Sequence, residues 1–196
     1  MNPFELFSIP PAFELDLPAL EAQHRELSRV LHPDRYVGSP AGERRQALGR
    51  AIEVNEAWRT LKAPIARAEA LCELLGVGHG ETKEPPADPS LLMEMMEQRE
   101  ALSDARRAKD LAAVEQLATN IAARQKEVQA ALSEAFAPLL AARSSAAASS
   151  APADSASPAT SASPPAQHTA LLRKLGELRY YRRFLDEANA ILDEIE

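Results

Sequence analysis

Apolar residues recur at helical spacing along most of the chain, which predicts an all-α protein. A helix predicted from Leu17 to Leu31 carries one apolar stripe, made of Leu20, His24, Leu27 and Leu31. A second helix, predicted from about Glu43 to Leu61, carries a stripe made of Ala47, Ala51, Val54, Trp58 and Leu61. Two shorter helices, at Phe4–Phe7 and from Pro64 to Gly76, complete a compact first domain over residues 1–77.

A segment with glycine, prolines and charges, residues 78–88, is typical of a linker. Three helices are predicted after it, from Pro89 to about Lys109, from Asp110 to about Leu140, and from Thr169 to Ile195. The second has apolar positions at Val114, Leu117, Ile121, Val128, Leu132, Ala135 and Leu139. The third has them at Leu171, Leu175, Leu178, Leu185, Leu192 and Ile195. Three such stripes bury one another as an antiparallel bundle over residues 89–196.

The stretch of residues 144–166 interrupts this bundle between its last two helices. Apart from Asp154 and Thr160 it contains only Ser, Ala and Pro, with no apolar periodicity. This composition predicts a disordered insert, to which we assign no function.

The tripeptide His32-Pro33-Asp34 falls where the first amphipathic helix must end, because proline disfavours helix in the residue before it. His32 and Asp34 are therefore expected on the loop between two packed helices. Arg25 and Arg29, four residues apart, lie off the apolar stripe of the preceding helix, and Arg35 follows the tripeptide. These arginines form either an ordinary solvated helix face or a basic rim that suits an acidic partner.

A second candidate surface lies on the helix after Pro89. Leu92 and Met96 are four residues apart but rotated about 100° from the inward stripe of Leu91, Met95, Leu102 and Ala105. Tyr180 and Phe184 are offset in a similar way on the last helix. Either the bundle has a wide apolar face, or Leu92, Met96 and Phe184 form a shared groove beside Glu97 and Glu100. Apolar anchors with a charged rim are typical of a specific interface.

Composition and charge argue against several other classes of function. The net charge of −7 gives no support for nucleic-acid binding, and neither a signal peptide nor a membrane span is recognisable, so we expect a cytoplasmic protein. The single cysteine, Cys72, lies in an apolar helix and is expected to be a buried thiol rather than a nucleophile. No histidine cluster, catalytic triad or glycine-rich phosphate loop is recognisable, so we expect no catalytic residues, metal or cofactor.

The order helix, His32-Pro33-Asp34, helix resembles the J domain, which activates DnaK-type chaperone ATPases. The segment from Ile52 to Leu61 (IEVNEAWRTL), followed by Pro64 and Arg67-Ala68-Glu69, resembles one branch, the HscB family of iron–sulfur cluster co-chaperones. Leu91-Leu92-Met93-Glu94 and Glu97-Gln98-Arg99-Glu100 resemble the scaffold-binding helix of that family. The likeness covers nearly the whole chain except the insert. Arg35 stands where J domains commonly have lysine, so the positive charge is kept.

This resemblance implies two partners, an HscA/DnaK-type chaperone and an IscU-type iron–sulfur cluster scaffold protein. The implied chaperone-binding residues are Arg25, Arg29, His32, Pro33, Asp34 and Arg35. The implied scaffold-binding residues are Leu92, Met93, Met96, Glu97, Arg99, Glu100 and Phe184. The chain would then deliver the scaffold protein and stimulate the partner's ATPase. Alternatives are a general J-domain co-chaperone with another client, or a helical scaffold in which the tripeptide is accidental.

Overall fold

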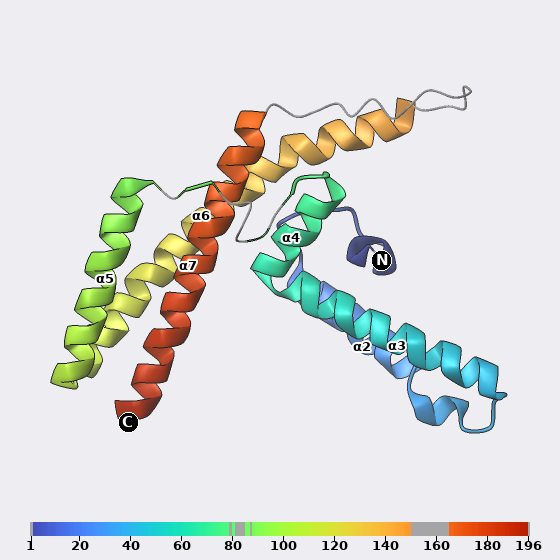
Figure 1. Ribbon diagram of the computed structural model, residues 1–196. Helices are drawn as coiled ribbons and strands as arrows, with labels where there is room; N and C mark the ends of the chain where they lie inside the picture. The colour runs from blue at the N-terminus through green and yellow to red at the C-terminus, as the bar shows by residue number, and fades with distance from the viewer. Residues whose placement is uncertain (1, 79, 81–84, 87, 150–164, 196) are drawn as a thin grey trace. The chain divides into compact units, whose positions relative to one another are not determined.

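The computed structural model describes residues 2–78, 80, 85–86, 88–149 and 165–195 (Figure 1). Within these residues every regular element is a helix, so the predicted all-α class is confirmed. The chain divides into two compact units. The first comprises Met1–Val77 with Leu139–Ala148, and the second comprises Gly78–Pro138 with Ser149–Glu196. No described helix combines the length and the hydropathy that crossing a membrane requires.

The first unit is built on a helical hairpin (Figure 1). Its elements are α1 (Pro3–Leu6), α2 (Leu17–Val30), the 3₁₀ helix η1 (Pro33–Tyr36), α3 (Ala41–Lys62) and α4 (Pro64–Leu74). The Asp16 side chain caps α2 by accepting a hydrogen bond of 3.0 Å from the amide of Ala19. The core contains Phe4, Phe7, Leu20, Leu61, Leu71 and Cys72. Cys72 is fully buried, as its apolar surroundings in the sequence predict.

One charged residue, Arg67, is buried within this unit. Its Nε donates to the carbonyl of Leu61 at 2.7 Å, and its Nη1 donates to the carbonyl of Phe13. The guanidinium also lies over the Phe13 ring, 5.4 Å from the ring centroid. Burial lowers the pKa of Arg67, because desolvation disfavours the charged form. Arg67 therefore joins the segment before α2 to the end of α3.

The second unit is formed by α5 (Pro89–Ala108), α6 (Leu111–Ser149) up to Pro138, and α7 (Pro165–Ile195). The Asp88 side chain caps α5 by accepting from the amide of Ser90 at 2.9 Å. Lys109 adopts the left-handed conformation (φ 53°) that ends α5, and Asp110 then caps α6. The apolar core includes Leu102, Val114, Ile121, Val128, Leu132, Phe136, Leu175, Leu178, Tyr181, Phe184, Ala188 and Ile191.

The buried stripe of α7 differs from the predicted one. Leu185 and Leu192 are only half-buried, whereas Phe184 and Ile191 are buried. From Leu175 to Phe184 the buried positions are three residues apart, and each such step falls about 60° short of a full turn. The buried stripe therefore winds around the helix, which a repeat of seven residues does not reproduce. On α6 the prediction missed Phe136, which is fully buried.

The predicted insert is shorter in the structure. Residues 144–149 continue α6, and Pro165 and Ala166 begin α7, so the prediction of disorder is wrong at both ends. Alanine, which is frequent in residues 144–149, has the highest helix propensity, so this part extends the preceding helix. The remainder, residues 150–164, lies outside the described residues.

Candidate functional site

The tripeptide His32-Pro33-Asp34 lies at the tip of the hairpin, between α2 and α3. α2 ends at Val30, and Pro33 opens η1, where its missing N–H leaves no hydrogen bond unmade. The amide of Arg35 donates to the carbonyl of His32 at 3.0 Å, which closes the turn. The expected display of the tripeptide on a connection between packed helices is thus what the fold produces.

His32 serves as the N-cap of η1. Its Nδ1 accepts a hydrogen bond of 3.3 Å from the amide of Asp34, and the same nitrogen lies 3.5 Å from Oδ2 of Asp34. The Asp34 side chain is 85% exposed, so its carboxylate is accessible to solvent. An exposed carboxylate is suited to pair with a cationic group on another protein.

Arg25 and Arg29 are exposed on α2, and each is partnered by an acidic residue of its own helix. Arg25 lies 3.9 Å from Glu21, and Arg29 donates to Glu26 at 2.7 Å. The Arg29 hydrogen bond is the main cause that lowers the pKa of Glu26, and attraction to Arg35 adds to it. Exposed pairs of this kind hold their partners weakly, so both arginines can exchange them for an external acid.

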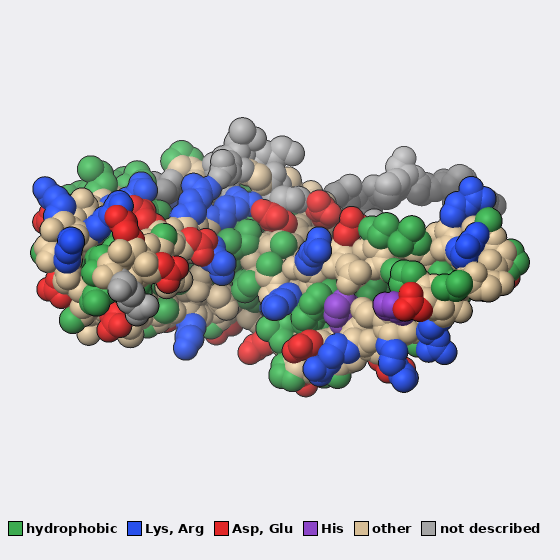
Figure 2. Space-filling model, turned by 90° about the horizontal axis from the view of Figure 1, so that it is seen from below, with side chains coloured by type: hydrophobic (Ala, Val, Ile, Leu, Met, Phe, Trp, Pro, Cys, Tyr) green, Lys and Arg blue, Asp and Glu red, His purple; other side chains and the backbone are tan. Residues whose placement is uncertain are grey.

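The hairpin tip is basic although the whole chain is acidic. Residues 25–50 contain six arginines and three acidic residues, while the net charge of the chain is −7. Figure 2 shows Lys and Arg side chains distributed over the surface of this unit. Such a local field favours association with an acidic surface.

In the second unit, α5 turns an apolar strip toward solvent. Leu92, Met93 and Met96 are all exposed, Met96 by 73%. Glu97, Arg99 and Glu100 are exposed on the same helix. Arg99 pairs with Glu187 of α7 at 3.4 Å, and Glu94 pairs with Arg124 of α6. Because these two pairs mark the flanks of α5 that meet its neighbours, the strip between them faces outward.

Phe184, the predicted aromatic member of this surface, does not lie on it. Its side chain is only 2% exposed, because the winding stripe of α7 carries it into the core. The expectation that Phe184 is an accessible contact is therefore wrong for this structure. The nearby Tyr180 is half-buried, and its hydroxyl donates to the carbonyl of Met95 at 2.9 Å. Burial raises the pKa of Tyr180. Sequence reasoning missed this link between α5 and α7.

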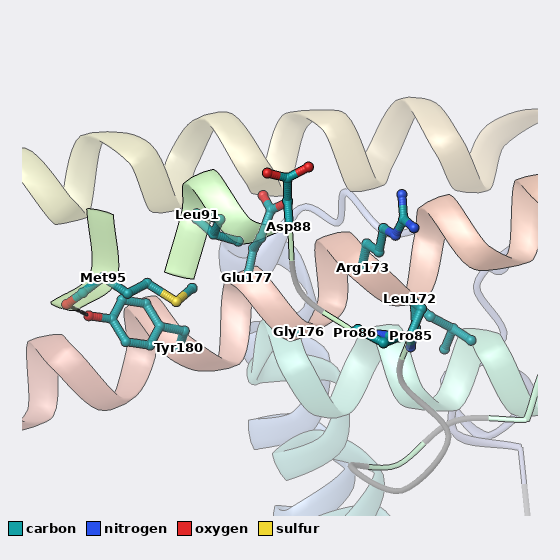
Figure 3. A pocket seen from close by; sticks show the side chains of 10 residues that line it. All are labelled: Pro85, Pro86, Asp88, Leu91, Met95, Leu172, Arg173, Gly176, Glu177 and Tyr180. Atoms are coloured by element: carbon teal, nitrogen blue, oxygen red, sulfur yellow. Dashed lines mark hydrogen bonds between the residues drawn. The ribbon is translucent and has the colours of Figure 1, made fainter. Parts of the chain in front are cut away.

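A cleft of about 370 Å³ lies beside the first turns of α5 (Figure 3). It is lined by Pro85, Pro86, Asp88, Leu91, Met95, Leu172, Arg173, Gly176, Glu177 and Tyr180. Its two carboxylates have partners within their own helices, since Glu177 accepts from Lys174 at 2.9 Å and Asp88 accepts from Ser90. The Ser90 hydroxyl is the main cause that lowers the pKa of Asp88. No sequence motif indicated this cleft. Among the described residues, no cluster of three or more His, Cys, Asp or Glu side chains could hold a metal ion.

Comparison with known proteins identifies the family of this chain. Residues 87–151 match the family model described as the HSCB C-terminal oligomerisation domain. The chain is 39% identical over 132 residues to the co-chaperone protein HscB homolog of Azoarcus sp. (strain BH72), covering 67% of this chain and 75% of that protein. It is 42% identical over 131 residues to the homolog of Bordetella pertussis, covering 67% and 76%. The chain belongs to the HscB co-chaperone family.

Solved structures agree with this assignment. Chaperone HscB from Vibrio cholerae matches over 100% of both chains, with a TM-score of 0.76 and 28% identity. Human co-chaperone protein HscB matches 97% of this chain and 81% of its own, with a TM-score of 0.75; at 23% identity it supports the fold alone. The function of this HscB-family chain is therefore that of a co-chaperone.

Proposed function

We propose that this chain binds an IscU-type iron–sulfur cluster scaffold protein, presents it to an HscA/DnaK-type chaperone in the cytoplasm, and stimulates that chaperone's ATPase. The observation that carries the proposal is the pairing of two exposed surfaces on one chain. A basic hairpin tip displays the exposed carboxylate of Asp34, and the outward strip of α5 displays three apolar side chains among charged ones.

The hairpin tip is suited to act on the chaperone by charge. Arg25, Arg29 and Arg35 would steer the tip toward an acidic surface, because complementary charge accelerates encounter. The Asp34 carboxylate would then pair with a basic group of the chaperone, while His32 and Pro33 hold the turn that positions it. ATP hydrolysis would take place on the partner, so this chain would supply no catalytic residue.

The outward strip of α5 is suited to hold the scaffold protein. Leu92, Met93 and Met96 supply apolar area, and methionine adapts its shape to an irregular partner surface. Glu97, Arg99 and Glu100 would form the charged rim that sets orientation. Phe184 would contribute from below, as part of the core that supports these helices, rather than as a contact.

Stimulation of the chaperone tests the first half of the proposal. Asp34→Asn removes the charge, so we expect it to abolish stimulation of an HscA-type ATPase while helicity by circular dichroism stays unchanged. Asp104→Asn, which alters an exposed aspartate of α5, is the matched control and should stimulate normally. Equal stimulation by wild type and Asp34→Asn would rule out the proposed role of the tripeptide.

Binding of the scaffold protein tests the second half. We would titrate the chain into an IscU-type scaffold protein by calorimetry, beside a Leu92→Ala/Met93→Ala/Met96→Ala variant. Because all three residues are exposed, the variant should fold normally and lose at least about tenfold in affinity. Phe184→Ala is unsuitable here, since it would open a core cavity. No binding by the wild-type chain would leave a J-domain co-chaperone with a different client.

A further inference from the structure

Four exposed apolar residues of the first unit are used by neither proposed surface: Val30, Val37, Leu48 and Ile52. Two of them, Leu48 and Ile52, lie on the same helix. Leu48 and Ile52 lie four residues apart on α3, and their side chains are 52% and 50% exposed. Spacings of four and three residues place Leu48, Ile52 and Asn55 along one stripe of the helix. The position of Asn55 therefore shows which side of the hairpin this stripe occupies.

Asn55 faces α2. Its Oδ1 lies 2.9 Å from Nε2 of His24, and His24 stacks on Trp58 with 5.1 Å between ring centroids. The hydroxyl of Ser28 lies 3.3 Å from the same His24 nitrogen. The stripe of Leu48 and Ile52 is thus on the side of the hairpin where His24 and Ser28 of α2 lie.

Antiparallel pairing then brings the apolar residues to the tip. Moving from His24 toward His32 along α2 corresponds to moving from Asn55 toward Leu48 along α3 (Figure 1). One turn places Ile52 about level with Ser28, and a second turn places Leu48 about level with His32. Arg25 is about 60° around α2 from Ser28 on this side. Arg25, the apolar pair of Leu48 and Ile52, and the tripeptide therefore lie near one another on the same side of the hairpin.

Val30 is also an exposed apolar residue of this hairpin, but it lies on a different side from Leu48 and Ile52. It is 42% exposed but lies about 160° around α2 from Ser28. It is instead about 20° from Gln23, whose side chain donates to the carbonyl of Phe7 next to α1. Val30 is consequently an exposed apolar residue on the opposite side of the hairpin, away from Leu48 and Ile52.

We propose that Leu48 and Ile52 form the apolar part of the chaperone-docking surface. This inference rests on the proposed function and adds the chemistry of the partner, an acidic surface with an adjoining apolar patch. The charge of the tip favours the chaperone over a second copy of the chain as the partner that binds here. A symmetric contact between two copies would bring the arginines of both tips together, which repel one another. The arginines would govern encounter, and the apolar pair would slow dissociation.

The test compares four chains in a steady-state ATPase assay with an HscA-type chaperone: wild type, Leu48→Gln/Ile52→Gln, Val30→Gln and Asp34→Asn. Glutamine keeps helix propensity close to that of leucine while removing apolar area. We expect the double variant to raise the concentration for half-maximal stimulation by at least about fivefold. Val30→Gln should stay within about twofold of wild type.

The ATPase results separate failure of this inference from failure of the proposed function. The inference is overturned if the double variant stimulates like wild type while Asp34→Asn does not stimulate. Failure of the proposed function itself looks different, because wild type and Asp34→Asn would then behave alike. Circular dichroism and thermal unfolding check the fold, and Ile52→Gln alone replaces the double variant if that chain is destabilised. Light scattering measures the molar mass of wild type and of the double variant. A lower molar mass for the double variant would show that wild type self-associates through this face, and would overturn the inference.

Discussion

Three of the four methionines of this chain lie at Met93, Met95 and Met96, and they differ in exposure. Met93 and Met96 point to solvent, whereas Met95 is half-buried beside Tyr180. We therefore expect dilute hydrogen peroxide to convert Met93 and Met96 to sulfoxides before Met95, because oxidation follows access to the sulfur. Peptide mass spectrometry over a time course measures the order. Faster oxidation of Met95 would contradict the exposed strip of α5.

A second prediction at the scale of single residues concerns the buried guanidinium of Arg67 and the free energy of unfolding. Arg67→Met removes the donors to the carbonyls of Leu61 and Phe13 and leaves these acceptors without them, at a cost of about 2–4 kcal/mol. The single tryptophan, Trp58, lies in the same unit, so its fluorescence during urea unfolding reports this change. Exposed Arg59→Met is the control and should change the free energy of unfolding by less than about 0.5 kcal/mol.

At the scale of elements, the cap of α5 supports the proposed scaffold-binding helix. Asp88→Ala removes the acceptor for the Ser90 amide and should cost about 1 kcal/mol. We expect faster hydrogen exchange in the first turns of α5, near Leu92, with little change in α7. Asp104→Ala, in the interior of α5, should leave that exchange unchanged. Equal exchange in wild type and Asp88→Ala would show that the cap does not hold this end of the helix.

Sequence periodicity predicted the helices and much of the site, and its errors share a cause. Prolines and capping aspartates mark where α2, α4 and α5 begin, and the tripeptide marks the hairpin tip. The seven-residue repeat failed on α7, where the buried stripe winds and carries Phe184 inward. The cleft beside Gly176 and the Tyr180 link to Met95 also depend on how helices pack, which the spacing within one helix does not contain.

At the scale of the whole molecule, the proposed function requires both surfaces to act from one chain. The basic tip belongs to the first unit and the outward strip of α5 belongs to the second, and one chain carries both. Joining the two surfaces covalently gives the bound scaffold protein a high effective concentration near the chaperone, which separate chains would lack. Wild type should therefore stimulate the ATPase more strongly when the scaffold protein is present than either variant of the two surfaces.

Mixing the two defective chains tests this requirement. One chain carries Asp34→Asn with an intact α5 strip, and the other carries Leu92→Ala/Met93→Ala/Met96→Ala with an intact tip. If delivery occurs within one chain, the mixture should not recover the scaffold-dependent part of the ATPase rate, because the first chain holds the scaffold protein without engaging the chaperone. The triple variant alone should keep its scaffold-independent stimulation, which controls for its fold. Recovery to the wild-type rate on mixing would mean that the two surfaces act independently, and the covalent connection would then have no role in delivery.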